Sequence, residues 1–271
     1  MTRLVMPGIP SSNVIAPAIG GGTTRDQFLG GRLVIIQPKE GPKGAIDALF
    51  LAAAVPGGPG QRALDVGSGI GLVAIALAQR APDLDVIGVE MQPGLCRLAE
   101  ENARANGLDS RVGIIEADIT APLSSLESAG LLPESFHHIA ANPPFFVEGK
   151  ARIPRDAATA RSRVAPEDTL EHWLRFSAAM TAPRGTLTLI HRADALPDIL
   201  KSLKRRFGAL KLFPLFPARG KPANRVIVQG IKGSNAPLEL YDGLVLHDSE
   251  GRYTGDAQAI LRDGRALELD H

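Results

Sequence analysis

Four short groups of residues between positions 63 and 145 combine glycines, carboxylates and an amide in an order that could hold a polar ligand. The first is an acid followed by three glycines on alternate positions, Asp65, Gly67, Gly69 and Gly71. Gly67 permits a tight turn, and the next two glycines allow a ligand and a helix backbone to come close. A dinucleotide-binding fingerprint would need glycine at position 72, where the chain has Leu72. Taken alone, this loop is equally compatible with a turn that only packs a helix against a strand.

Two further groups are carboxylates that close apolar runs. Glu90 ends such a run nineteen residues after Gly71, and Asp118 ends the next one. If the runs are strands, Glu90 can accept both hydroxyls of a ribose, and Asp118 can accept the amino group of an adenine. Met91 and Ile119 directly follow the two acids, so we include them among the candidate ligand contacts.

The fourth group is the tetrapeptide Asn142, Pro143, Pro144 and Phe145, which follows a further apolar run. Proline cannot continue a parallel ladder, so these residues are predicted just past the carboxyl end of a strand. Ligands of open α/β sheets bind at that edge. The simple alternative is a β-turn that ends the strand and has no chemical role.

The hydrophobic pattern predicts the elements that position these groups. Strands are predicted at 62–66, 85–89, 112–117, 137–141, 186–190, 210–217 and 225–229, the last two as a hairpin pair. Helices are predicted at 48–55, 71–80, 94–106, 123–129, 165–182, 195–207 and 256–262. The alternation indicates a doubly wound α/β sheet whose carboxyl edge collects the four groups. Phe28–Gln37 is predicted to form a short hairpin strand beside this sheet, and Leu238–His271 one more strand before the last helix.

With these groups in register, the chain resembles the class I S-adenosylmethionine-dependent methyltransferases, and among them the amino-methylating branch marked by Asn-Pro-Pro-Phe/Tyr. The segments 28–33, 44–47 and 251–254 make it similar to the bacterial family that methylates an adenine in the anticodon loop of valine tRNA. The resemblance implies a Rossmann-like fold with seven mostly parallel strands, the last inserted antiparallel. It also implies S-adenosylmethionine as cofactor and a place for Asp47 beside it. The implied cofactor contacts are Asp47, Asp65, Gly67, Gly69, Gly71, Glu90, Met91, Asp118 and Ile119.

The implied catalytic residues are Asn142, Pro143, Pro144 and Phe145. Methyl transfer from a sulfonium is an in-line displacement, so positioning matters more than proton transfer. An adenine amino nitrogen is a poor nucleophile, and acceptors such as the Asn142 side chain and the Pro143 carbonyl can hold its two hydrogens. Phe145 offers a ring for stacking worth about 1–3 kcal/mol. The family frequently has Tyr at this position, so a phenol hydrogen bond is absent here.

The positive charges predict two RNA contacts on a chain of net charge +1. The segment between Ile199 and Leu238 has nine basic residues and no acid. The candidate phosphate contacts are Lys150, Arg152, Arg155, Arg161 and Arg163 in one loop and Arg219, Lys221 and Arg225 in another. Such segregation can build a basic face on a neutral protein. For Lys201, Lys204 and Arg205 the favoured explanation is the solvated side of an amphipathic helix.

The composition and the positions of glycine and proline predict the organisation of the chain. Residues 1–25 form a mobile arm, 26–235 the methyltransferase domain, and 236–271 a strand-helix extension packed on the same domain. The single cysteine, Cys96, lies in a predicted helix and is expected to be a buried thiol. Because one cysteine cannot form a disulfide within the chain, a cytoplasmic location is predicted. No signal peptide, membrane span or metal-ligand spacing is evident. The sequence assigns no oligomeric state.

Two other functions fit the same residues. A protein glutamine side chain also presents a planar NH₂, so a protein amide N-methyltransferase would use the same tetrapeptide, although no helical substrate-binding domain precedes Phe28. A non-catalytic cofactor-binding or RNA-binding module would leave Asn-Pro-Pro-Phe without a purpose. Trp173 and Met180 are predicted to lie in the core, and His191 is assigned no chemistry.

Overall fold

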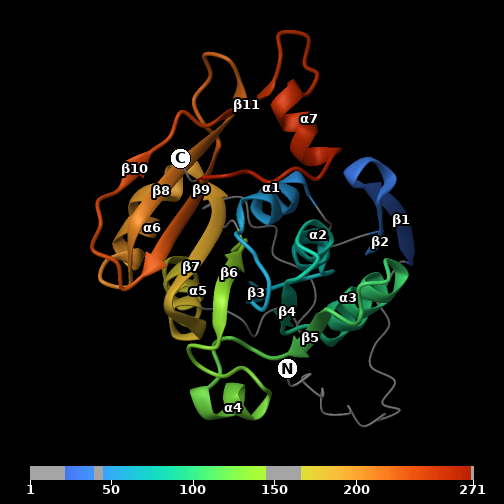
Figure 1. Cartoon of the computed structure of the whole chain (residues 1–271), viewed down its shortest axis with the longest axis vertical. Helices are drawn as coiled ribbons and strands as arrows, with labels where there is room; N and C mark the ends of the chain where they lie inside the picture. Colours follow the sequence, from blue (N-terminus) through green and yellow to red (C-terminus); the bar gives the residue numbers. More distant parts are fainter. Residues whose placement is uncertain (1–21, 40–44, 145–165, 270–271) are drawn as a thin grey trace.

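The computed structural model describes residues 22–39, 45–144 and 166–269, and its centre is a nine-stranded sheet. The strands run β10-β8-β9-β7-β6-β3-β4-β5 across the sheet, and β11 also pairs with β8 (Figure 1). Their bounds are β3 Arg62–Val66, β4 Asp85–Glu90, β5 Val112–Glu116, β6 Phe136–Ala141, β7 Thr181–Arg192, β8 Phe207–Ala218, β9 Arg225–Lys232, β10 Glu239–Leu240 and β11 Leu244–His247.

All neighbours in this sheet are parallel except at β9, which is antiparallel to both β7 and β8. The predicted α/β architecture with an inserted antiparallel last strand is therefore confirmed. The C-terminal segment differs from its prediction, because it supplies two short strands instead of one. Both pair with β8, which would otherwise expose the edge of a strand of 12 residues.

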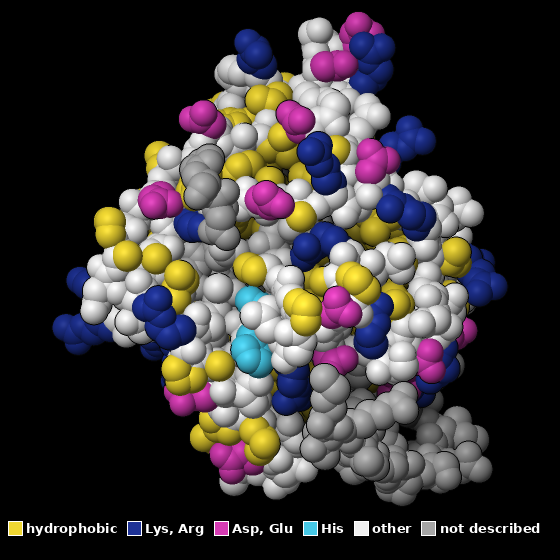
Figure 2. Space-filling view, in the orientation of Figure 1, with side chains coloured by type: hydrophobic (Ala, Val, Ile, Leu, Met, Phe, Trp, Pro, Cys, Tyr) yellow, Lys and Arg dark blue, Asp and Glu magenta, His cyan; other side chains and the backbone are white. Residues whose placement is uncertain are grey.

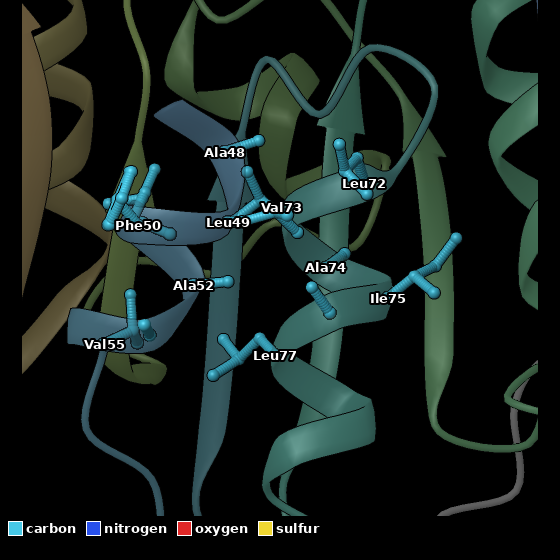
Figure 3. Close-up of a cluster of buried hydrophobic side chains, with 14 of the residues drawn as sticks. Ala48, Leu49, Phe50, Ala52, Val55, Leu72, Val73, Ala74, Ile75 and Leu77 are labelled. Atoms are coloured by element: carbon cyan, nitrogen blue, oxygen red, sulfur yellow. The ribbon is translucent and has the colours of Figure 1, made fainter. Parts of the chain in front are cut away.

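Helices cover the two faces of the sheet and enclose two hydrophobic clusters. One face carries α1 Ile46–Ala54, α2 Leu72–Arg80 and α3 Pro93–Ala105; the other carries α4 Leu123–Ser128, α5 Pro166–Met180 and α6 Leu196–Leu203. The last helix, α7 Gly255–Leu261, contacts α1. Figure 3 shows α1 and α2 packed side by side through Leu49, Val73 and neighbouring apolar side chains. This packing holds the start of α2, and hence the preceding glycine loop, against the sheet.

The hairpin strand predicted at Phe28–Gln37 is part of a separate hairpin, which is formed by β1 Thr23–Phe28 and β2 Leu33–Pro38. A 3-10 turn at Leu29–Gly31 separates the two strands, and within the described residues neither pairs with the main sheet. Residues 23–25 therefore belong to a strand and not to the predicted arm. The rest of that arm lies outside the described residues.

Two asparagines of α3 attach β2 to the domain. The Asn102 side chain accepts a hydrogen bond from the Ile36 N–H at 2.6 Å and donates to the Ile36 carbonyl at 2.9 Å and the Ile70 carbonyl at 3.0 Å. Asn106 makes the same pair of bonds with Val34. Side chains four apart on a helix lie on one face, as do residues two apart on a strand, so the two amides match the β2 backbone.

The helix predicted at 195–207 is shorter than expected. It begins as a 3-10 turn at Ala193–Ala195, continues as α6 and ends at Leu203. Arg205 adopts a left-handed φ of 69°, which an α-helix cannot accommodate, and β8 begins two residues later. The strand predicted at 186–190 is longer at both ends, because β7 begins at Thr181 beside β6 and continues to Arg192 alongside β9.

We expect the buried His138 to make unfolding depend on pH. Its ring bonds to the side chains of Thr186 and Gln61, both at 2.8 Å, and burial lowers its pKa from 6.5 to about 4, with the nearby positive charges of His137 and Arg80 adding to the effect. The unfolded state binds the extra proton, so stability falls by up to about 3 kcal/mol as the pH drops from 6.5 through 4. Denaturant unfolding at several pH values measures this. His138→Gln should remove most of the dependence, whereas His137→Gln, at the exposed neighbour, should retain most of it, because burial is the main cause of the shift.

Candidate active site

Strand register brings the predicted groups to one edge of the sheet. Val66, the last residue of β3, pairs with Val89 of β4 on one side and with Ala141 of β6 on the other. Gly67, Glu90 and Asn142 each come next in their own strands or loops. Because neighbouring strands lie about 4.8 Å apart, the glycine loop sits directly between the acid and the amide. Glu90 in turn pairs with Glu116, two residues before Asp118.

The glycine loop has the backbone that its spacing predicts. Gly67, Gly69 and Gly71 have φ values of 63°, 56° and 83°, in the left-handed region that other residues rarely adopt. A side chain at Gly71 would approach the Ala99 Cβ of α3 to 3.0 Å, so this glycine permits close helix packing. At Gly69 nothing lies within 4 Å of an added Cβ. The loop therefore combines a packing role at one end with open space above its middle.

Glu90 anchors the loop from the neighbouring strand. Its Oε2 accepts a hydrogen bond from the Gly69 N–H at 3.1 Å, and its Oε1 accepts one from the Gln92 N–H at 2.9 Å. The residue is only 7% exposed, so its two oxygens have a defined direction. Each carboxylate oxygen has a second lone pair, so the two oxygens can still accept hydrogen bonds from the two hydroxyls of a ribose.

The other predicted contacts on this side differ in exposure. Asp118 is exposed. Its Oδ1 accepts two hydrogen bonds from Thr120, one from the backbone N–H at 2.8 Å and one from the side-chain hydroxyl at 2.7 Å. Met91 is 49% exposed, and Ile119 packs partly against the second hydrophobic cluster. A large apolar side chain exposed at the end of a strand suits a contact with a flat ligand.

Asp65 lies beneath the loop and is buried. Its Oδ2 accepts a hydrogen bond from the Ala74 N–H at 3.2 Å, which ties β3 to the first turn of α2. Burial raises the pKa of this carboxyl to about 8; the Ala74 bond opposes the shift and the charge of Glu90 adds to it. Below that pH Asp65 carries a proton, so in this state it acts as a neutral link between strand and helix.

Three observations test whether these residues fit the cofactor that the resemblance implies. Space is open above Gly69, Glu90 retains two acceptor directions, and the buried Ser68 hydroxyl has no hydrogen-bond partner within the part of the chain that the structure describes. An open cradle with unused polar capacity suits a ligand with hydroxyl and amino groups. The loop therefore fits S-adenosylmethionine.

Asp47 and Arg225 were predicted for different partners, but the structure brings them together. Asp47 lies in the first turn of α1, and its Oδ2 is 2.8 Å from the Nε of Arg225 at the start of β9. Both side chains are mostly buried, with exposed fractions of 14% and 28%. Arg225 is thus held by an acid of its own protein, which disfavours a direct contact with RNA phosphate.

The amide group lies partly within the described residues. Asn142 is half-buried, Pro143 is buried and Pro144 is exposed. Phe145 and the candidate RNA contacts Lys150, Arg152, Arg155, Arg161 and Arg163 lie outside the described residues, so their roles stay predictions. His191, buried near the end of β7, has a pKa lowered by burial.

Two exposed loops rise at the same edge of the sheet. Arg219 and Lys221 are exposed in the loop between β8 and β9. The loop 248–254 follows β11, and both project from the top of the molecule in Figure 1. They are neighbours because His247 pairs with Ala218 and the His247 ring bonds the Pro217 carbonyl at 2.9 Å. In Figure 2, basic and acidic side chains are scattered over the visible face in small groups, in keeping with the near-zero net charge.

The sequence interpretation missed one residue at this edge. Trp173 of α5 was predicted to lie in the core, and it does pack partly against the second cluster, but its ring also faces Gly67. Met180 is fully buried as predicted, and Cys96 is also buried. A tryptophan in a helical apolar stripe looks the same in the sequence whether it meets the core or a ligand loop, so nothing in the pattern distinguishes the two.

We expect the Glu90→Ala variant to bind S-adenosylmethionine more weakly by about 1–3 kcal/mol, since hydrogen bonds to a buried carboxylate are lost. Isothermal calorimetry measures the affinity. Glu116→Ala is the matched control, because this acid is the exposed strand partner of Glu90 and should leave the affinity unchanged. Equal affinities for the wild type and Glu90→Ala would remove Glu90 from the cofactor site.

The residues that the structure describes contain neither a membrane-spanning helix nor a group of metal-ligating side chains. None of their helices is both long and apolar enough to cross a membrane. In the same ranges, no three His, Cys, Asp or Glu side chains are grouped so as to hold a metal ion.

Comparison with known proteins identifies the family. Residues 45–164 match the family described as the methyltransferase small domain. A tRNA1(Val) (adenine(37)-N6)-methyltransferase of Aeromonas hydrophila is 31% identical over 77% of this chain and 84% of its own length. One from Porphyromonas gingivalis is 32% identical over 72% of this chain and 75% of its own length. The crystal structure of a predicted O-methyltransferase from Agrobacterium tumefaciens superposes with a TM-score of 0.69 at 28% identity, covering 82% of this chain and 98% of that one. The chain therefore belongs to the S-adenosylmethionine-dependent methyltransferase family that includes these bacterial tRNA1(Val) adenine N6-methyltransferases.

Proposed function

We propose that this methyltransferase methylates the exocyclic N6 amino group of an adenine in tRNA. The observation that carries the proposal is the position of Asn142 and Pro143, which follow β6 directly beside the glycine loop. The pairing of Val66 with Ala141 places an amide acceptor next to the residues that fit the cofactor. The printed names of the relatives support adenine in tRNA as the substrate. Such a substrate favours a cytosolic enzyme.

The chemistry assigns a separate task to each group. When bound, S-adenosylmethionine would supply an electrophilic methyl group and leave as S-adenosylhomocysteine, and the methylated nitrogen would lose one proton to water. The Asn142 side-chain oxygen and the Pro143 carbonyl accept the two hydrogens of the amino group, so that its nitrogen can turn its lone pair toward the methyl group. Pro143 is buried and has no N–H, so its backbone adds no competing donor. Because the nitrogen gains positive charge during the transfer, these acceptors bind the transition state more tightly than the substrate.

In this proposal two basic elements of the chain bind the substrate RNA. Arg219 and Lys221 lie on the loop between β8 and β9, and the basic loop that follows Asn-Pro-Pro-Phe supplies the second element. Phosphate contacts of this kind give affinity without reading sequence. Arg225 supports the first loop instead of contacting RNA, since Asp47 holds its guanidinium at the base of β9. A target base in an unpaired loop is turned out more cheaply than one in a duplex.

The decisive test compares acceptors in one assay with radiolabelled S-adenosylmethionine. The wild-type protein is incubated in parallel with unmodified tRNA, with a glutamine-containing peptide and without any acceptor. Mass spectrometry then identifies the methylated nucleosides of the tRNA and any methylated peptide. We expect N6-methyladenosine from tRNA only. Transfer to the peptide would favour a protein amide methyltransferase. A 2′-O-methyl nucleoside would instead favour the chemistry named for the Agrobacterium tumefaciens neighbour.

A further inference from the structure

The indole of Trp173 lies against the cofactor loop. A Cβ added at Gly67 would overlap its six-membered ring, with Cη2 nearest, Cζ2 at 2.9 Å and Cζ3 at 3.1 Å. The three atoms form the far edge of the ring, so the side chain reaches the loop with its tip. Gly67 also has a φ of 63°, and the position is therefore restricted to glycine for two separate reasons.

The position of Gly67 gives this contact a meaning beyond packing. Gly67 follows Val66 and Asn142 follows Ala141, and Val66 and Ala141 are register partners on adjacent strands. The ring tip thus meets the loop where the cofactor residues and the amide acceptor are neighbours. Trp173 stays half-buried, whereas Leu174 and Phe176 on the same helix are buried in the core. The ring therefore extends from the second hydrophobic cluster to the glycine loop.

The helix that carries Trp173 is anchored in the core at its C-terminal end. It begins at Pro166, downstream of Asn142 along the same chain. At its other end Met180 is fully buried, and Thr181 continues directly into β7. Because this helix is anchored, the Trp173 ring can fix the position of the glycine loop relative to the carboxyl ends of the strands.

We infer that Trp173 is a positioning residue, whose indole fixes Gly67 and thereby sets the distance between the bound cofactor and Asn142. This inference rests on the proposed function in taking the glycine loop as the cofactor site. Displacement of reacting groups by about 1 Å can slow a reaction 10²-fold, so a loosened loop has consequences for turnover. The effect is expected in kcat, because the phosphate contacts that hold RNA lie elsewhere.

A size-exchange experiment tests the contact. Leucine ends at its Cδ atoms and lacks the ring edge that meets Gly67, so Trp173→Leu makes room there while it keeps an apolar side chain. In the wild-type background Gly67→Ala suffers both the overlap and the left-handed backbone, and cofactor affinity should fall about a hundredfold. In the Trp173→Leu background the overlap is gone, and the same change should weaken binding only about tenfold.

Gly69→Ala is the matched control, because Gly69 has a similar φ of 56° and nothing within 4 Å of an added Cβ. Its effect should be about tenfold in both backgrounds. The two glycine variants and the unchanged chain, each in both backgrounds, make six proteins. Their melting temperatures report the overlap at Gly67 in the absence of ligand. If Gly67→Ala folds only together with Trp173→Leu, that result also supports the contact. Equal effects of Gly67→Ala in the two backgrounds, within about threefold, would overturn it.

Turnover separates positioning from mere stability. Trp173→Leu should lower kcat roughly tenfold and leave the KM for tRNA within about twofold, and Trp173→Phe should recover part of the loss. A lower melting temperature with unchanged kcat would leave the residue a structural role only. The only tryptophan of the chain also gives a direct signal, since S-adenosylhomocysteine should change its fluorescence. A wild type that binds this ligand but does not methylate tRNA would refute the proposed substrate and not the contact.

Discussion

The Asn142→Ala variant is expected to lose about 10²–10³-fold in kcat, with a similar loss in kcat/KM for tRNA. The reason is that its amide oxygen accepts a hydrogen most strongly when the attacking nitrogen becomes cationic, so the interaction is made mainly in the transition state. Cofactor affinity should change little, because the glycine loop follows the neighbouring strand β3 and Glu90 lies on β4, beyond it. Steady-state kinetics with purified tRNA measure the effect.

Controls for this variant address folding and side-chain loss in general. Asn142 is half-buried, and no backbone group of a helix or strand depends on its amide among the described residues, so the melting temperature should be retained. Asn235→Ala is the matched control, because this asparagine is exposed beyond the end of β9, away from the carboxyl edge, and should keep full activity. A rise in KM alone would mean that Asn142 binds the substrate without assisting the transfer.

The combined Arg219→Ala and Lys221→Ala variant is expected to bind tRNA more weakly and with less dependence on salt. Each lost phosphate contact lowers the slope of log affinity against log salt by roughly 0.7–0.9, so two contacts lower it by about 1.4–1.8. Affinity at low salt should fall about tenfold or more, and equally for different RNAs, since phosphate contacts carry no sequence information. A salt titration of tRNA binding measures both quantities.

A charge-matched control lies at the opposite end of the same strand. Lys201 and Lys204 are exposed on and just after α6, close to where β8 begins, so Lys201→Ala with Lys204→Ala removes two positive charges far from the strand ends that carry Asn142. That variant should retain the wild-type slope. An equal reduction in both double variants would show a diffuse attraction by net charge in place of two specific contacts.

Local patterns were enough to predict the elements and the chemical groups of the site. Three alternate glycines, acids that close apolar runs and prolines that cannot continue a ladder depend on the backbone of only a few residues each. Once the alternation of strands and helices indicated a parallel sheet, the common edge of Asp65, Glu90 and Asn142 followed from topology. The structure confirms this architecture and places Gly67, Glu90 and Asn142 side by side at that edge.

Contacts between distant segments were decided only by the tertiary structure. Asp47 and Arg225 are 178 residues apart, and the sequence assigned one to the cofactor and the other to RNA, whereas the fold joins them in an ion pair. Trp173 looked like any apolar residue of a helix until α5 was placed over the glycine loop. The reason is physical: periodicity records which face of an element is apolar, but not which element it meets. The amino-acid sequence therefore determined which chemical groups are available at the site. Tertiary packing determined which of these side chains already contact another part of the protein.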